Sequence, residues 1–171
     1  MRAAFCLIFS FFIATGNTFA QDTTIDSKLL RLKGLPLIAD KSSIVKTYGR
    51  PLKVDQPNYE CGFYSHDSIQ YFQLWYKHLN FIGNDEEKYI LENIKFHLNS
   101  SLSLEYGHWK LNSKLTKTAF VQIFGISELD SFTDRKNGVT EILMFFNNSD
   151  DGMIFSFKDD HLIEATYWSP C

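Results

Sequence analysis

The sequence predicts an α+β fold of two tandem repeats, each a short helical segment followed by an antiparallel β-meander, with the helices packed on one sheet face. Two segments, 40–49 and 116–125, match in register, and both end in glycine. Stretches rich in β-branched and aromatic residues follow each segment, and turn-forming residues separate these stretches. Helices followed by antiparallel strands are typical of the α+β class, and a repeated match indicates duplication of one unit.

The first twenty residues predict a secretory signal peptide. Arg2 supplies a positive charge, residues 3–14 form an apolar run, and Thr18 to Ala20 have the small-x-small pattern of a cleavage site. The apolar run is too short to span a bilayer. We therefore expect a bacterial protein secreted across the inner membrane, either periplasmic or extracellular.

Length and charge limit the class of partner. The chain of 171 residues is long enough for one domain with an ordinary hydrophobic core. Its formal net charge is −3, and cleavage of the signal peptide makes the charge more negative because it removes Arg2. An acidic chain binds nucleic acid or an anionic membrane poorly, so we expect neither partner. No later segment is apolar for long enough to predict membrane insertion.

The repeats define the predicted domain boundaries. These are 1–20 for the signal peptide, 21–33 for a leader segment, 34–109 for the first repeat and 110–171 for the second. Asp40 and Thr116 are suitable N-caps for the two helices. Gly49 and Gly125 allow the left-handed residue that ends a helix. Apolar residues form one stripe on each helix: Ile44, Val45 and Tyr48 on the first, and Phe120, Val121 and Phe124 on the second.

Candidate strands follow each helix. In the first repeat they cover 69–77 and 89–96. In the second repeat 139–146, 153–157 and 162–168 form a meander, with polar turns between them.

Strand alternation divides the residues of 69–77 between two faces. Phe72, Leu74 and Tyr76 form the face expected to pack beneath a helix. The other face is the predicted protein-binding face, which comprises Tyr71, Gln73, Trp75, Lys77 and, if the sheets of the two repeats are continuous, Trp168. Trp and Tyr are the residues most enriched at interface hot spots. The alternative is ordinary packing, in which the other repeat or the segment 106–109 covers this face.

Cysteine usage predicts one disulfide. Cys6 lies within the signal peptide, so Cys61 and Cys171 remain as an even pair in an oxidising compartment. Their bridge would close a loop of about 110 residues. The chain-entropy model predicts that such a bridge stabilises the folded protein by roughly 4–5 kcal/mol.

The sequence gives little evidence for a catalytic site. Ser65 to Ser68 contain nucleophile, base and acid types, but neighbours in sequence rarely face each other as a triad requires, so the segment predicts a polar turn. The histidines His78, His97, His108 and His161 lack the spacing that places two imidazoles on one metal ion. We expect no enzyme activity, no cofactor and no metal.

Two short patterns resemble those of a known family. Val45 to Pro51 form a helix-ending Val-Lys-Thr-Tyr-Gly-Arg-Pro turn, and Phe155 to Leu162 form a Phe-Ser-Phe-Lys-Asp-Asp-His-Leu hairpin. They resemble the tandem-repeat fold of the β-lactamase inhibitor protein and of small SmpA/OmlA-type envelope lipoproteins. The chain lacks a lipobox cysteine and the inhibitor's cysteine pattern. The resemblance implies a non-catalytic module that binds another protein with its sheet.

Together these observations predict a secreted, non-catalytic protein-binding module that inhibits an enzyme or neutralises a toxin. One alternative is a structural component of a cell-envelope assembly. A second alternative is a small-ligand carrier or hydrolase with a cleft between the repeats, which a pocket with convergent polar groups would favour.

Overall fold

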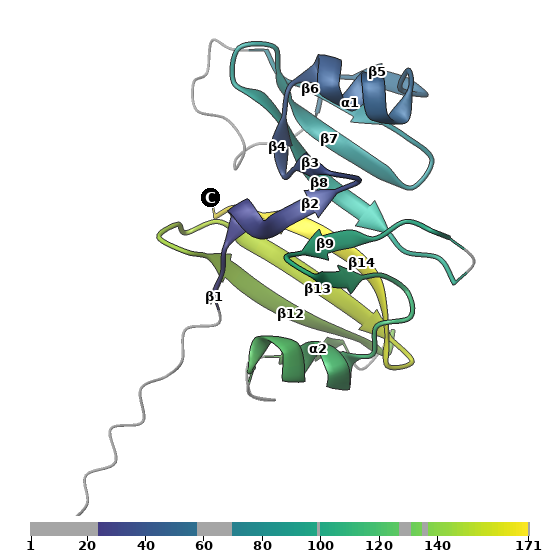
Figure 1. The fold of residues 1–171 in the computed structure, drawn as a ribbon, viewed down its shortest axis with the longest axis vertical. Helices are drawn as coiled ribbons and strands as arrows, with labels where there is room; N and C mark the ends of the chain where they lie inside the picture. The colour runs from purple at the N-terminus through teal and green to yellow at the C-terminus, as the bar shows by residue number, and fades with distance from the viewer. Residues whose placement is uncertain (1–23, 58–69, 99, 127–130, 135–136, 171) are drawn as a thin grey trace, which may run out of the picture.

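The computed structural model describes residues 24–57, 70–98, 100–126, 131–134 and 137–170 (Figure 1). The predicted signal peptide, the polar segment Ser65 to Ser68, and the predicted disulfide partners Cys61 and Cys171 lie outside the described residues. No helix among the described residues has the length and apolar character needed to cross a membrane.

The predicted α+β class of helix-on-sheet tandem repeats is wrong, because the described chain is mostly β-structure. It contains fourteen strands, two α-helices and one short 3-10 helix. The strands form a large ten-stranded mixed sheet and a separate four-stranded sheet. The prediction underestimated the β-content because strands of only two or three residues show no detectable alternation.

The large sheet runs in the order β1-β12-β13-β14-β8-β7-β6-β5. The bounds are β1 Thr24–Ile25, β12 Val139–Phe146, β13 Gly152–Lys158, β14 His161–Trp168, β8 Lys88–Lys95, β7 Leu79–Asn84, β6 Phe72–Trp75 and β5 Lys53–Asp55. Two further strands join it: β11, Ser131–Asp134, pairs with β12, and β4, Ile38–Ala39, pairs with β8. The β1–β12 pair is parallel and the others are antiparallel, so the sheet is mixed.

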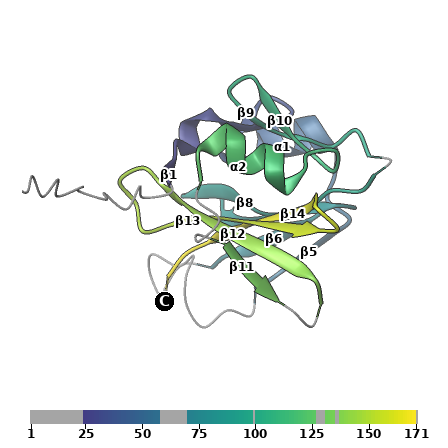
Figure 2. The ribbon, with the colours of Figure 1, turned by 90° about the horizontal axis from the view of Figure 1, so that it is seen from below.

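The remaining elements form a second layer. The small sheet has the order β10 (Trp109–Leu111), β9 (Leu104–Tyr106), β2 (Leu30–Leu32) and β3 (Leu35–Pro36). The helices are α1 (Lys41–Tyr48), α2 (Lys117–Phe124) and the 3-10 helix η1 (Ser27–Leu29). Figure 2 shows α1, α2, β9 and β10 on the same side of the large sheet. The layer that covers this side therefore contains a sheet as well as helices.

Both predicted α-helices are confirmed. Thr116 Oγ1 accepts a hydrogen bond from Ala119 N at 3.1 Å, as expected of an N-cap. The Asp40 side chain makes no such bond at the start of α1. Gly49 and Gly125 end the helices with φ of 81° and 65°, which glycine adopts without a Cβ penalty.

The core lies between the large sheet and the layer above it. Ile44 of α1 and Phe120 of α2 are fully buried there. The face predicted from alternation in 69–77 is confirmed: Leu74 is buried in this core, and Phe72 and Tyr76 pack against it.

The strand predictions were right for the second half of the chain and incomplete for the first. Segments 139–146, 153–157 and 162–168 are β12, β13 and β14 within one residue. The segment 69–77 yields the shorter β6. Strand β7 was missed because its six residues include two asparagines and a glycine, which are depleted in strands and typical of turns.

The two halves of the chain share the large sheet through one pairing. The C-terminal strand β14 pairs with β8, with Ala165 opposite Ile94 and Thr166 opposite Asn93. The sheet therefore runs from β12 to β5 with no break.

Candidate functional site

The side of the large sheet opposite the helices is called the outer face here. Its residues on the strands β6, β7, β8 and β14 include Gln73, Trp75, Asn80, Glu92, Asn93, Glu164, Thr166 and Trp168, and on β12 and β13 they include Leu143, Phe145 and Ile154. Trp75 and Trp168 therefore lie on one face of one continuous sheet.

The predicted binding residues differ in exposure. Trp75 is 37% exposed, and Trp168 is half-buried. Tyr71 and Gln73 are buried, and the Tyr71 hydroxyl donates to a carboxylate oxygen of Glu87. Lys77 is exposed but lies in the β6–β7 turn beyond the end of the strand. The five residues thus do not form one open surface.

A buried polar cluster occupies the middle of the outer face. Glu92 is only 6% exposed, and Gln73 Nε2 donates to its two carboxylate oxygens at 2.9 and 3.2 Å. Asn80 Nδ2 donates to the same carboxylate. Asn93, the next residue of β8, bonds to the neighbouring strand β14. Its Nδ2 donates to Thr166 Oγ1 at 2.9 Å and to Glu164. These bonds link β6, β7, β8 and β14 side chain to side chain.

A β-bulge places Glu92 in this cluster. Asn80 is opposite Asn93, but the next residue, Phe81, is opposite Leu91, so Glu92 is an extra residue in β8. A bulge redirects the side chain of its strand. Here it turns an acidic side chain toward the two amides while Leu91 stays in the core.

Burial raises the pKa of Glu92 to about 7, from an ordinary value of 4.5. The folded protein therefore holds this proton at pH values where the unfolded chain has lost it. Stability from this group is fully present below pH 4.5 and falls as the pH rises toward 7. We expect a decrease of up to about 2 kcal/mol over this range after allowance for solvent screening.

The Glu92→Gln variant provides the measurement, because its side chain does not titrate. Urea unfolding of both proteins at several pH values gives the difference in free energy of unfolding between wild type and variant. This difference should fall between pH 4.5 and 7 and become constant above. A difference that does not change with pH would show that the Glu92 pKa is not raised.

Aromatic side chains lie at the two ends of the outer face. At the β6 end, Trp75 Nε1 donates to Asp55 Oδ1 at 2.5 Å, and Asp55 also pairs with Lys53. The hydrogen bond from Lys53 is the largest effect on Asp55 and lowers the pKa of its carboxyl, which Trp75 also lowers. At the other end, the rings of Phe145 and Trp168 meet edge to face, with centroids 5.6 Å apart.

A glycine allows the contact between Phe145 and Trp168. Phe145 of β12 and Trp168 of β14 both lie opposite Gly152 of the intervening strand β13. Because Gly152 has no side chain, the two rings can meet above it. Sequence reasoning did not single out Phe145, since its partner is on a strand two positions away in the sheet.

Two histidines also come together that sequence spacing did not connect. His78 precedes β7 and His97 follows β8, and the antiparallel pairing of these strands places their rings 4.5 Å apart. Across the residues that the structure describes, no group of three or more His, Cys, Asp or Glu side chains is arranged to hold a metal ion.

The resemblance to the β-lactamase inhibitor family is still a prediction that rests on two short patterns. Comparisons with protein-family models, with curated proteins and with solved structures gave no match to this chain.

Proposed function

We propose that this is a secreted, non-catalytic binding module whose outer face docks another protein, with the Phe145–Trp168 pair as the main contact. The observation that carries the proposal is this pair, at the end of a sheet face on which no described helix packs (Figure 2). Phe145 is 37% exposed, and Trp168 is half-buried beside the half-buried aliphatic side chains of Leu143 and Ile154. Together they form a small apolar patch.

The physical argument concerns rigidity and desolvation. The patch residues lie on hydrogen-bonded strands, so binding costs little free energy for ordering this part of the chain. A partner that covers the two rings removes apolar surface from water, and Trp is among the commonest hot-spot residues. The polar cluster around Glu92 is buried and its side chains bond one another, so we assign it no part of the contact.

Trp75 supports a second contact at the opposite end of the face. Its indole is fixed by the hydrogen bond to Asp55, and part of the ring remains exposed. A partner that reaches both ends of the face would therefore touch an aromatic anchor at each end.

The test compares three baits with the wild-type protein: the double variant Phe145→Ala/Trp168→Ala, Trp75→Ala and Trp109→Ala. Partners are captured from the envelope and secreted fractions of the native host, and the affinity of the captured partner for each variant is then measured. We expect the double variant to weaken binding at least about thirtyfold, the size of a hot-spot loss. Trp75→Ala should weaken it by a smaller factor and leave the melting temperature nearly unchanged.

Trp109→Ala is the matched control. Trp109 is 43% exposed, but it lies on β10 of the small sheet, on the side opposite the outer face (Figure 2). Its substitution should leave the affinity unchanged. Equal losses for all variants, or a captured partner whose affinity depends on none of them, would rule out the outer face as the binding surface.

A further inference from the structure

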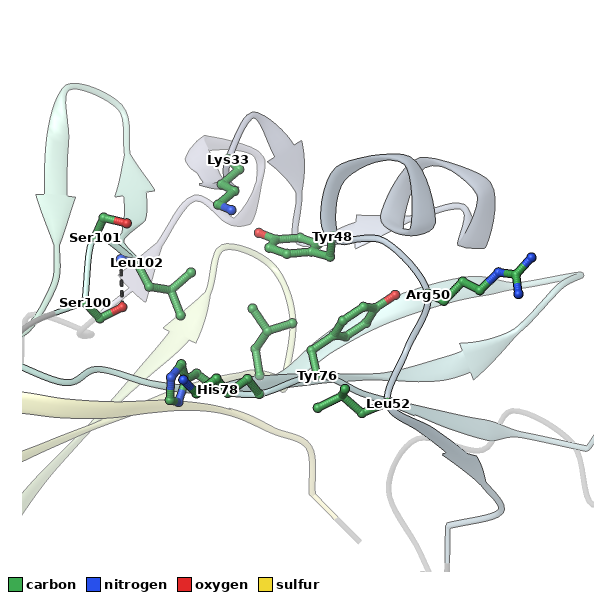
Figure 3. Close-up of a pocket in the computed structure, with 11 residues that line it drawn as sticks. Lys33, Tyr48, Arg50, Leu52, Tyr76, His78, Ser100, Ser101 and Leu102 are labelled. Atoms are coloured by element: carbon green, nitrogen blue, oxygen red, sulfur yellow. Dashed lines mark hydrogen bonds between the residues drawn. The ribbon is translucent and has the colours of Figure 1, made fainter.

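A pocket opens on the helix side of the large sheet, where four chain segments meet (Figure 3). These are the β2–β3 turn, the end of α1, the β6–β7 turn and residues 100–102. Its volume is about 340 Å³, which is within the range of small-molecule sites. Among the predicted binding residues, Lys77 is the one that lines it.

The lining is basic although the chain as a whole is acidic. Lys33, Arg50, Lys77 and His78 contribute to it, and none of the described lining residues is acidic. The ion pairs among the described residues involve neither Lys33, Arg50 nor Lys77. Positive charge is therefore concentrated at the pocket and not neutralised by these pairs.

A tight turn fixes Lys33 at the pocket. Lys33 and Gly34 form the two-residue loop between β2 and β3, and both have positive φ, 51° and 80°. This is the backbone of a type I′ hairpin turn. Lys33 Nζ lies 5.0 Å from the centroid of the Tyr48 ring, a cation–π contact. Figure 3 shows the Lys33 amino group directed toward Tyr48, whereas the Arg50 guanidinium points away from it.

Two tyrosines form the apolar side of the pocket. The rings of Tyr48 and Tyr76 are 5.6 Å apart and tilted by 54°, and both pack against the buried Phe81. Tyr48 Oη donates to Leu32 O at 3.4 Å, and Tyr76 Oη donates to Gly49 O at 3.3 Å. Burial raises the pKa of both hydroxyls, and the charge of Glu105 acts in the same direction on Tyr48. Both rings are therefore neutral and held in place.

The remaining polar groups complete a site for an anion. Ser100 Oγ accepts the Leu102 N–H at 3.0 Å, so its own proton is free to be donated. Figure 3 shows Ser100 and His78 on the same side of the pocket as Leu102. Desolvation lowers the pKa of His78, and the charges of His97 and Lys77 lower it further. A bound anion would act in the opposite direction and raise this pKa.

We propose that this pocket binds a small organic anion, a carboxylate or phosphate carried on a flat aromatic group. The anionic group would be held by Lys33, His78 and Ser100, and the ring would pack against Tyr48 and Tyr76. Neither a bare inorganic anion nor a neutral ring would use both halves of this lining. The proposal does not depend on protein binding by the outer face, because the two sites lie on opposite sides of the sheet.

The test is calorimetric titration of the folded protein, without the predicted signal peptide, with four probes: 2-naphthoate, neutral 2-naphthamide, cationic 2-naphthylmethylamine and inorganic phosphate. We expect 2-naphthoate to bind at least tenfold more tightly than each of the others. Equal binding of naphthoate and naphthamide would remove the role of the charge. Equal binding of naphthoate and phosphate would remove the role of the ring. An absence of naphthoate binding at millimolar concentration would overturn the proposal.

Variants locate the site. Lys33→Met should weaken naphthoate binding about tenfold, and Lys33→Arg should retain most of the affinity because it keeps the charge. Lys110→Met is the matched control, since Lys110 is an exposed lysine on β10 that does not line the pocket. His78→Gln provides a second test if Lys33→Met alters the thermal melt. Naphthoate binding that neither the Lys33→Met nor the His78→Gln variant weakens would place the anion elsewhere.

Discussion

Replacement of Phe120 by alanine is expected to lower the free energy of unfolding by about 3–5 kcal/mol. Phe120 is 0% exposed and is the one fully buried residue of α2. Its ring lies 4.8 Å from that of Phe155 and 5.2 Å from that of Phe157, both on β13. The variant would leave a cavity between the helix and the sheet and remove the main contact that holds α2 in place.

Urea unfolding and thermal melting measure this loss. The matched control is Phe145→Ala, which makes the same truncation at an exposed position and should cost less than about 1.5 kcal/mol, mainly the ring contact with Trp168. Similar losses at the two positions would mean that α2 does not pack on the sheet through Phe120.

The second large effect is expected for Gly83→Ala, which should cost at least about 3 kcal/mol or prevent folding. Gly83 of β7 is opposite Tyr89 of β8. A Cβ at this position would overlap the Lys88 carbonyl oxygen and lie 2.7 Å from Tyr89 Cα. Because these are backbone atoms, no side-chain rotation relieves the overlap, and the strands must separate.

The Gly107→Ala variant is the control for this prediction. Gly107 lies in the β9–β10 turn with φ of 57°, and apart from its own chain neighbours no atom is within 4 Å of an added Cβ. It should cost only the strain of the left-handed backbone, about 1–2 kcal/mol. Comparison of the two urea midpoints measures the difference. A Gly83→Ala protein as stable as the Gly107→Ala protein would contradict the close approach of β7 and β8.

Local signals predicted the two helices and the C-terminal strands. Thr116, Gly49 and Gly125 act through their own backbone neighbourhood, so their roles can be predicted from a short stretch of sequence. The strands β12 and β14 have eight residues each, long enough for alternation and turn residues to be recognised. Features of this kind depend on contacts close in sequence.

The rest depends on contacts between distant residues. Strand β7 contains Asn80, Gly83 and Asn84, which are typical of turns, and β2 is too short to show a pattern. These omissions made the fold class wrong. The continuity of the sheet depends on Ala165 lying opposite Ile94, a pairing that no local signal encodes.

The same limit applies to the candidate sites. Alternation placed Gln73 and Trp75 on one face, but it does not specify that Gln73 bonds the buried Glu92. The role of Glu92 depends on a one-residue bulge, which shifts the register of β8 without a signal in the sequence. Lys33 and His78 line the same basic pocket, which four separate chain segments form. Spacing along the chain therefore does not predict this pocket.

The position of β14 has a consequence for the order of folding. Residues 161–168 follow every other described strand in the sequence, yet they form an interior strand between β8 and β13. Until these residues join the sheet, part of the β8 edge, at Asn93 to Lys95, and the edge of β13 lack their native partner. Unpaired strand edges recruit other chains, so a chain in which residues 161–168 are absent or not yet paired is the form most prone to aggregate. The pairing of β14 is therefore the step that joins the two parts of the large sheet.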